Sequence, residues 1–177
     1  MIKNVVFDLG NVLITFRLEA YLRARVPDET ARRKILEAVF LSPEWLMLDR
    51  GTLSEEEAIR IYHKRCPEAK AVLGSSLHDL YEGLLQLINE TIDLMSDLKN
   101  RGYHIYILSN YQEKAFAYIT EKYGFPAHAD GRVLSYEVKS LKPEPEIFQA
   151  LFDKYGLIPD ETIFIDDSID NVRTAES

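Results

Sequence analysis

Short apolar runs punctuate the chain, and each of them ends abruptly at polar residues. The runs and the residues that end them are 5–7 before Asp8, 103–108 before Ser109 and Asn110, and 162–165 before Asp166 and Asp167. Consecutive apolar residues are typical of strands that are buried on both faces, as in a parallel sheet. Because ligands bind beyond the carboxyl ends of such strands, we expect these polar side chains to converge if the strands are neighbours.

Helical patterns lie between the apolar runs. Their apolar stripes and terminal glycines are Ile92, Met95 and Leu98 before Gly102, residues 115–123 before Gly124, and Ile147, Leu151 and Tyr155 before Gly156. The last of these helices is predicted to begin at Pro143, since proline favours the first turn of a helix. Strands that alternate with helices predict an α/β fold, a three-layer doubly wound parallel sheet built from βαβ units.

Residues 16–86 interrupt this alternation with continuous helical periodicity and no convincing strand. Helix starts are predicted at Asp28 and at Ser54, where Ser54 and Glu57 have the spacing of a capping box. We therefore expect an α/β core formed by residues 1–15 and 87–177 and an inserted α-helical cap formed by residues 16–86. An insertion after the first strand lies over that strand's carboxyl end, so the cap is a candidate lid.

Composition restricts the partners and the compartment. The chain has 177 residues, a net charge of −8 and one cysteine, Cys66, which cannot form an internal disulfide. Negative charge disfavours nucleic acids and anionic membranes, and a lone cysteine suits a reducing compartment. The first residues lack the features of a signal peptide, and no apolar run approaches the roughly 18 residues of a membrane span. We expect a cytoplasmic monomer or weak homodimer that binds neither nucleic acid nor membrane.

Four short motifs occur in a fixed order along nearly the whole chain. They are VVFDLGNVL at 5–13, ILSN at 107–110, SLKPEPEIF at 140–148 and FIDDS at 164–168. Together they resemble the haloacid dehalogenase superfamily of hydrolases, in the branch that carries a helical cap after the first strand. The first motif is similar to that of sugar-phosphate phosphatases such as α-glucose-1-phosphate phosphatase. The resemblance implies a Rossmann-like core and a small phosphorylated metabolite as substrate, with a sugar phosphate favoured.

The resemblance also implies a nucleophile and a metal site. Asp8 would attack phosphorus and form an aspartyl-phosphate, with Mg²⁺ offsetting the negative charges that oppose this attack. The expected protein ligands of Mg²⁺ are the Asp8 carboxylate, the Gly10 carbonyl oxygen, and Asp166 or Asp167. Asp170 is a fourth carboxylate that we expect in the same neighbourhood.

Three further residues are expected to hold the phosphoryl group. The Ser109 hydroxyl and the Asn110 backbone N–H would bind phosphoryl oxygens. Lys142 would offset negative charge on both the phosphoryl group and Asp8, which is a positioning and electrostatic role.

The sequence departs from the family pattern at Gly10, where most phosphatases of the family carry an Asp that protonates the leaving group. Water, another group, or a leaving group that needs little help would have to replace that acid. Without any replacement, cleavage should depend steeply on the basicity of the leaving group. A metal-independent 2-haloacid dehalogenase and a non-catalytic regulatory protein remain alternatives, but the doubled acid Asp166-Asp167 favours a retained cation and a phosphatase. The family also continues with a further strand and helix beyond the position of Ser177.

The cap offers candidates for substrate contacts. Trp45, Asp49 and Arg50 are placed where a helical cap could face the cleft, with Trp45 favoured as part of the cap core, and Arg17 could reach an anionic or hydroxylated substrate. The histidines lack metal-ligand spacing and are expected to be structural or exposed, namely His63, His78, His104 and His128.

Overall fold

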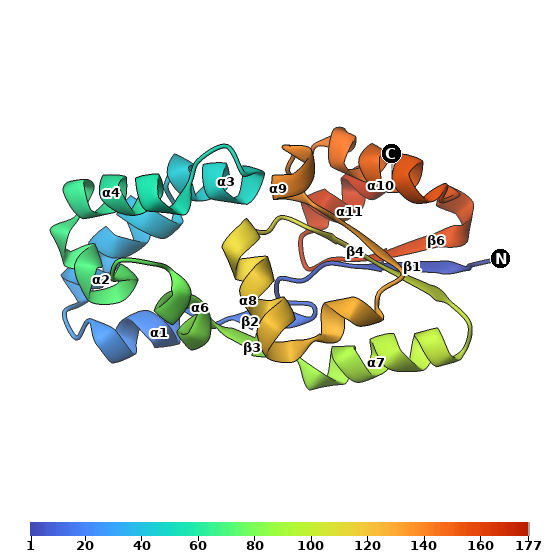
Figure 1. Cartoon of the computed structure of the whole chain (residues 1–177), viewed down its shortest axis with the longest axis horizontal. Helices are drawn as coiled ribbons and strands as arrows, with labels where there is room; N and C mark the ends of the chain where they lie inside the picture. The colour runs from blue at the N-terminus through green and yellow to red at the C-terminus, as the bar shows by residue number, and fades with distance from the viewer. Residues whose placement is uncertain (177) are drawn as a thin grey trace.

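A four-stranded parallel sheet forms the centre of the chain's core in the computed structural model, which describes residues 1–176 (Figure 1). The strand order is β5-β4-β1-β6, and all three pairs are parallel. The strands are β1 (Asn4–Phe7), β4 (His104–Ser109), β5 (Gly131–Leu134) and β6 (Thr162–Ile165). The three strands predicted from apolar runs are confirmed, and β5 is an additional strand. The further strand and helix that the resemblance implies would follow Ser177, outside the described residues.

The register of the sheet brings the polar residues after each strand together. Phe7 at the end of β1 pairs with Ile107 in β4 and with Ile165 in β6. The strands that carry Asp8, Ser109 and Asp166 are therefore neighbours whose carboxyl ends lie at one edge of the sheet.

Helices cover both faces of the sheet, as a doubly wound fold requires (Figure 1). The helices of the core are α7 (Asn89–Asn100), α8 (Glu113–Tyr123), η3 (Phe125–His128), α9 (Ser135–Val138), α10 (Pro145–Tyr155), η4 (Pro159–Glu161) and α11 (Ile169–Ala175). The helix expected to begin at Pro143 begins instead at Pro145. Glu144 is extended, with φ −63° and ψ 130°, because the ring of a following proline disfavours helical backbone in the residue before it.

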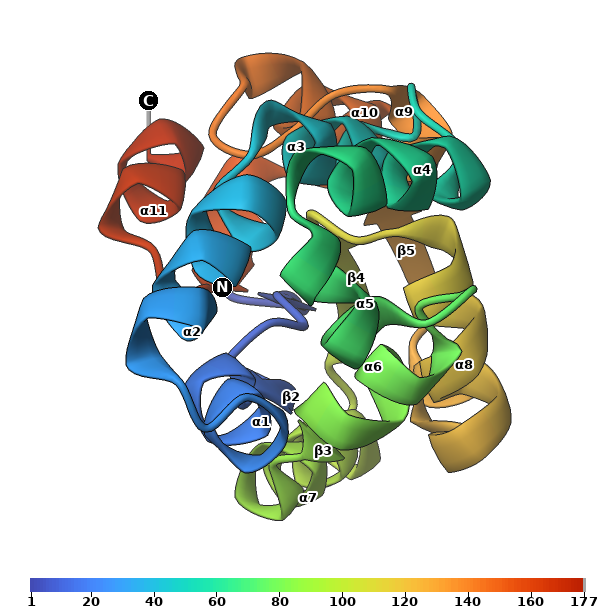
Figure 2. The same ribbon diagram turned by 90° about the vertical axis from the view of Figure 1, so that its left-hand side faces the viewer.

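A group of helices connects β1 to α7 at one end of the molecule, seen end-on in Figure 2. Its elements are α1 (Leu18–Arg25), α2 (Glu29–Ile35), the π-helical turn η1 (Leu36–Phe40), α3 (Pro43–Arg50), α4 (Glu55–Arg65), η2 (Pro67–Ala69), α5 (Lys70–Leu73) and α6 (His78–Leu84). We call this helical segment the cap. The predicted helix starts are present, since Asp28 accepts a hydrogen bond from the Ala31 amide and Ser54 accepts one from the Glu57 amide.

Two short strands border the cap. Strand β2 (Ile14–Phe16) pairs antiparallel with β3 (Leu85–Leu87), so both connections between cap and core run through one two-stranded sheet. The expectation of no strand in residues 16–86 is wrong at the two ends of that range. Each strand has three residues, which is too short for a recognisable period, and the partners are about seventy positions apart in the sequence.

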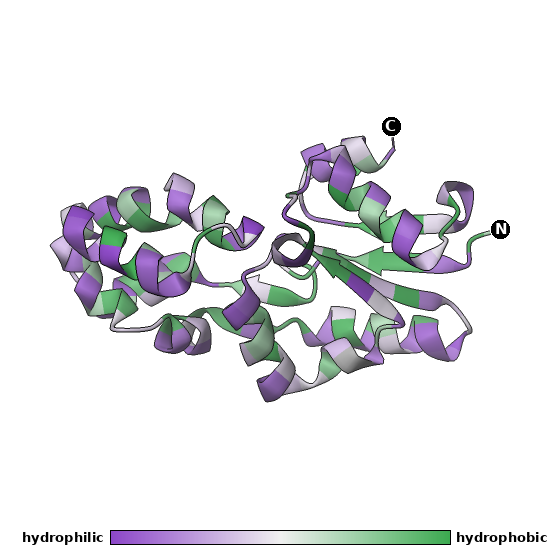
Figure 3. Ribbon diagram, turned by 45° about the horizontal axis from the view of Figure 1, so that its top comes forward, coloured by the Kyte–Doolittle hydropathy of each residue, from purple (hydrophilic) through white to green (hydrophobic). Residues whose placement is uncertain are grey.

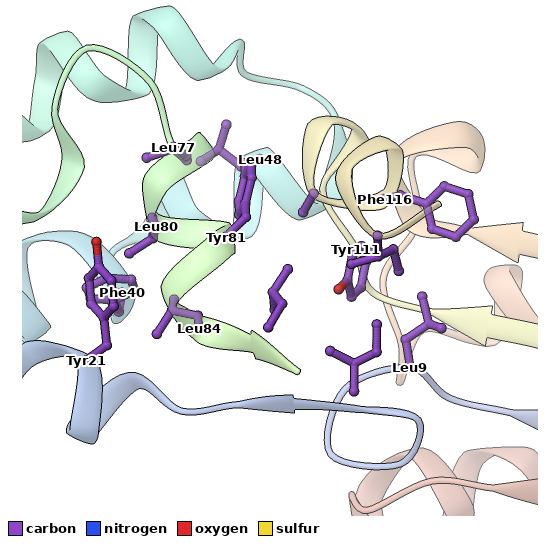
Figure 4. Packing of buried hydrophobic residues seen from close by; sticks show 14 of the residues in the cluster. Leu9, Tyr21, Phe40, Leu48, Leu77, Leu80, Tyr81, Leu84, Tyr111 and Phe116 are labelled. Carbon is purple, nitrogen blue, oxygen red and sulfur yellow. The ribbon is translucent and has the colours of Figure 1, made fainter. Parts of the chain in front are cut away.

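The buried apolar residues form two clusters. Figure 3 colours the ribbon by hydropathy and shows that the strands of the sheet are largely apolar. The smaller cluster lies between the sheet and α10 and includes Val6, Ile147 and Leu151. The larger cluster runs without interruption from the other face of the sheet into the cap, and Figure 4 shows Leu9 and Phe116 at its core end and Phe40 at its cap end. Among residues 1–176, no helix combines the length and apolar character needed to cross a bilayer.

Candidate active site

Asp8 occupies the end of the central strand, where its side chain is almost completely buried. Its carboxylate Oδ1 lies 2.8 Å from the Lys142 ammonium, and the Ser109 hydroxyl at the end of the neighbouring strand donates a hydrogen bond to the same carboxyl group. Burial raises the pKa of Asp8, whereas the Lys142 charge and the two hydrogen bonds act in the opposite direction. The structure thus places Asp8, Ser109 and Lys142 in one cluster.

Lys142 is buried between two carboxylates. Its Nζ lies 2.8 Å from Asp8 and 2.5 Å from Asp166 Oδ2, and its side chain is 1% exposed. The Asn110 side chain fixes the Lys142 backbone in both directions, because Asn110 Oδ1 accepts from the Lys142 N–H (2.7 Å) and Nδ2 donates to the Lys142 carbonyl oxygen (2.9 Å). The Asn110 side chain therefore positions the lysine, and phosphoryl binding by the Asn110 N–H remains a prediction.

Three carboxylates form an acidic cluster beside the lysine. Oxygen atoms of Asp8, Asp166 and Asp167 all lie within 4.8 Å of one another. Asp166 is held by the Ser168 N–H (2.8 Å) and by Asn171 Nδ2 (2.9 Å), so its position does not depend on a metal ion. Three carboxylates and one ammonium leave two negative charges, and oxygen donors of this kind suit Mg²⁺. These residues therefore fit a divalent cation.

Of two further residues expected at the metal site, Asp170 lies outside this cluster and Gly10 lies close to it. Asp170 is not part of it, because its side chain is 71% exposed and lies 3.6 Å from Arg173 on the outside of α11. Gly10 lies close to the cluster, since a Cβ built on it would be 3.9 Å from Asp8 Oδ2. Metal binding by the Gly10 carbonyl oxygen remains a prediction.

A cavity of about 240 Å³ opens between the cap and the end of the sheet. Its lining residues are Gly10, Asn11, Ile14, Thr15, Phe16, Trp45, Asp49, Tyr81, Leu85, Asn110, Tyr111, Gln112 and Ala115. Asp49 is the one Asp, Glu, His, Lys or Arg of this set. Most of the wall is aromatic or aliphatic, so the cavity suits a group with little charge.

The cap candidates divide into those that line this cavity and those that do not. Trp45 lines it and also packs against Phe40, with ring centroids 4.8 Å apart, so it contributes to both cap core and cleft. Arg50 does not line the cavity; its guanidinium forms two hydrogen bonds with the carboxylate of Glu144 in the core. Arg17 is exposed and is likewise absent from the lining. None of the four histidines belongs to the acidic cluster of the described residues.

Several residues of the site were not predicted from the sequence. Asn11 donates to Asp167 (2.9 Å) and has a left-handed backbone with φ 52°, which asparagine tolerates better than most residues. Asn171 fixes Asp166 from the first turn of α11, and Gln112 lies on the cavity wall. Asparagine next to Gly10 was a usable signal for a tight turn, whereas Asn171 and Gln112 had no distinguishing neighbours.

Comparisons with known proteins identify the family of this chain. A family model described as haloacid dehalogenase-like hydrolase matches residues 2–177. A D-ribitol-5-phosphate phosphatase of Bacteroides thetaiotaomicron is 26% identical over 187 aligned residues, which cover 98% of this chain and 86% of the relative. A sesquiterpene phosphatase of Aspergillus oryzae is 24% identical over 178 residues, covering 99% and 85%. A crystal structure of a Bacteroides thetaiotaomicron enzyme of the same superfamily, in complex with magnesium and inorganic phosphate, has a TM-score of 0.77 at 26% identity, covering 99% of this chain and 90% of that chain.

Proposed function

This chain belongs to the haloacid dehalogenase-like hydrolases and is a phosphoric monoester hydrolase, and from that premise we propose a Mg²⁺-dependent phosphatase that acts through an aspartyl-phosphate at Asp8. The observation that carries the proposal is the buried array in which Lys142 lies between Asp8 and Asp166. The magnesium and phosphate complex of a structural neighbour also supports the proposal of a Mg²⁺-dependent phosphatase.

The first half of the reaction uses the carboxylate of Asp8. One Asp8 oxygen forms a bond to phosphorus while the bond from phosphorus to the leaving oxygen breaks. A carboxylate attacks a phosphate anion slowly unless the negative charges are offset, and the Lys142 ammonium 2.8 Å from Asp8 supplies part of that offset. When bound, Mg²⁺ would supply the remainder by withdrawing charge from phosphoryl oxygens. Ser109 would bind a phosphoryl oxygen beside Asp8.

The second half of the reaction regenerates the enzyme. Water attacks the phosphorus of the aspartyl-phosphate, the Asp8–phosphorus bond breaks, and inorganic phosphate leaves. Asp166 keeps Lys142 in place during both halves, because their 2.5 Å contact is fixed from behind by Ser168 and Asn171. Asp166 would thus keep the Lys142 charge beside Asp8 in both steps.

The cavity wall indicates the kind of leaving alcohol. No lysine or arginine is among the described residues that line it, so a second phosphate or a carboxylate on the substrate would lack a partner there. Phe16 and Trp45 offer apolar faces on which a sugar ring can pack. Polar lining residues such as Asn110 can form hydrogen bonds with the hydroxyl groups of a sugar. We therefore propose a monophosphate of a small neutral alcohol, with a sugar or polyol phosphate favoured.

The test is a substrate panel assayed for phosphate release with Mg²⁺ and with chelator. We expect sugar and polyol monophosphates to be cleaved, sugar bisphosphates to be cleaved poorly, and all activity to need Mg²⁺. Halide release from 2-chloropropionate without metal would favour the dehalogenase alternative instead. Absence of release from every ester and halide would favour the non-catalytic alternative.

A further inference from the structure

The residue that usually protonates the leaving group has no counterpart at Gly10. A Cβ built there would have a single neighbour within 4 Å outside the adjoining residues, the Asp8 carboxylate itself. Apart from Asp8, no titratable side chain therefore lies within 4 Å of the position from which the missing side chain would extend. A phosphate ester of a sugar or polyol still needs a proton on its leaving oxygen, because an alkoxide is a strongly basic leaving group.

The cap places a carboxylic acid in the same cavity. Asp49 lies in the last turn of α3, is half-buried, and lines the cavity together with Gly10, Asn110 and Tyr111. It is the one Asp, Glu, His, Lys or Arg among the described residues of that lining. Among the described residues, no lysine, arginine or histidine forms an ion pair with Asp49. Its carboxyl group therefore has no structural ion pair to lose when it takes up a proton.

The surroundings of Asp49 suit a group that gains and loses a proton. Burial raises the pKa of Asp49 to about 7, although a hydrogen bond from Gln112 acts in the opposite direction. Gln112 in turn lies 3.1 Å from the Tyr81 hydroxyl. An amide and a hydroxyl can each donate or accept a hydrogen bond. Gln112 and Tyr81 can therefore provide a hydrogen-bond partner for Asp49 both when it is protonated and when it is ionised.

The tyrosines around Asp49 stay neutral in the physiological range. The tyrosines whose electrostatics Asp49 affects are Tyr62 on α4, Tyr81 on α6 and Tyr111 after β4, with Tyr81 and Tyr111 visible in Figure 4. Burial raises the pKa of each of them above its usual range. Glu55 accepts a hydrogen bond from the Tyr81 hydroxyl at 3.1 Å.

Tyr111 is affected by the charges of both Asp49 and the nucleophile. After burial, the negative charges of Asp8 and of Asp49 are the two largest causes that raise the pKa of Tyr111. One phenol therefore lies within electrostatic reach of both carboxylates. Its hydroxyl is buried without a hydrogen-bond partner among the described residues, so it is free to donate a hydrogen bond.

The backbone of Asp49 is tied to the core. The Ser135 hydroxyl donates to the Asp49 carbonyl oxygen (2.5 Å) and accepts from the Tyr111 N–H (2.9 Å). Lys139 Nζ donates to the Gly51 carbonyl oxygen (2.6 Å), two residues further along. The end of α3 is thereby held over the carboxyl end of the sheet.

We propose that Asp49 is the acid and base of this phosphatase and replaces the residue missing at Gly10. In the first half, the electron pair of the breaking bond goes to the leaving oxygen, which takes the Asp49 proton and departs as the neutral alcohol. In the second half, the attacking water gives a proton to the Asp49 carboxylate, and the electron pair of the Asp8–phosphorus bond returns to Asp8. The cycle consumes one water and restores both groups. The inference rests on the proposed phosphatase function.

The experiment compares Asp49→Asn with wild type on a poor and a good leaving group. Asn keeps the shape and the contact with Gln112 but cannot give up or take a proton. We expect kcat for a primary alkyl phosphate to fall by about 10²- to 10⁴-fold, the usual contribution of general acid–base catalysis. With 4-nitrophenyl phosphate, one equivalent of nitrophenolate should still be released in a rapid burst, followed by slow turnover. Asp49→Glu should recover part of the lost rate.

Controls separate this role from a structural one. Asp79→Asn removes an exposed acid from α6 of the same cap and should behave as wild type. Unchanged alkyl phosphate turnover in folded Asp49→Asn would overturn the role of Asp49 while leaving the phosphatase in place, as would equal losses of burst and alkyl activity. A wild-type protein inactive on every ester would remove the proposed function and this inference together.

Discussion

Arg50, in the last turn of cap helix α3, forms a two-pronged ion pair with Glu144, the residue that precedes α10 in the core. Glu144 follows Lys142 by two positions, and Arg50 follows Asp49 directly. The ion pair thus joins the segment that carries the buried lysine to the segment that carries the candidate acid. Because each side chain is about one-third exposed, the pair is reachable by solvent and salt.

Breaking this ion pair should impair catalysis more than stability. Arg50→Met or Glu144→Gln is expected to cost about 0.5–1 kcal/mol of unfolding free energy, the range of exposed pairs. Turnover of an alkyl phosphate should fall by about tenfold or more, because small misplacements of a reacting group are costly. The measurement is a double-mutant cycle on both kcat and denaturant unfolding.

A second ion pair within the cap is the matched control. Arg65 binds Glu44 in the same two-pronged manner, but both residues belong to the cap. Arg65→Met should lower stability to a similar extent and leave kcat close to wild type. Equal losses of kcat in Arg50→Met and Arg65→Met would show that the Arg50 pair has no special part in positioning Asp49.

The same ion pair predicts an acid-sensitive contribution to stability. The hydrogen bonds from Arg50 hold the pKa of Glu144 at about 2, below its unfolded value of about 4.3. A lowered folded-state pKa means that the stabilisation is complete above the unfolded value and is lost as pH falls toward 2. The difference in unfolding free energy between wild type and Glu144→Gln should therefore be constant from pH 8 to about 5 and shrink below it. A difference that grows on acidification would contradict this assignment.

Much of the site could be predicted from the sequence because it depends on where strands end. Asp8, Ser109 and Asp166 each follow an apolar run, and parallel pairing alone brings such residues to one edge. The predicted start of α10 at Pro143 was wrong because a helix beginning there would include Glu144, whose helical backbone is disfavoured by the proline that follows it. The Arg50–Glu144 pair joins residues about ninety positions apart, so it depends on how the cap packs against the core. The partners of Asp166 and Asp49 depend on tertiary packing for the same reason.

Removing the nucleophile should abolish activity and retain the fold. Asp8→Asn has nearly the same shape, and Lys142 keeps its 2.5 Å contact with Asp166, so no unpaired buried charge is created. We expect loss of nearly all phosphate release, together with a far-ultraviolet circular dichroism spectrum like that of wild type. Turnover near the wild-type rate in rigorously purified Asp8→Asn protein would contradict the aspartyl-phosphate mechanism.

Substitutions of the neighbouring residues Asp166 and Asp167 should affect Mg²⁺ binding and turnover differently. Asp167 is exposed and held by one hydrogen bond from Asn11, so Asp167→Asn should weaken Mg²⁺ binding by calorimetry and raise the Mg²⁺ needed for half-maximal activity. Asp166 also holds Lys142, so Asp166→Asn should lower kcat even at saturating Mg²⁺. Asp170→Asn is the control, because Asp170 lies outside the cluster. Full activity of wild type in excess chelator would show that no cation is required.

Gly10→Asp should rescue the loss that Asp49→Asn causes. Gly10 has no left-handed backbone, and a Cβ there meets nothing closer than 3.9 Å, so the substitution is compatible with the loop. The new carboxyl group would stand beside Asp8, and a like charge so close raises the pKa of one of the pair, which favours a protonated acid at neutral pH. In the Asp49→Asn background, we therefore expect Gly10→Asp to restore alkyl phosphate turnover by at least about tenfold while changing 4-nitrophenyl phosphate turnover less. Gly10→Asn in the same background provides similar bulk without a transferable proton and should restore nothing. Equal recovery by the Asp and Asn variants would mean that residue 10 acts through packing, and that the missing proton donor is not what limits the Asp49→Asn enzyme.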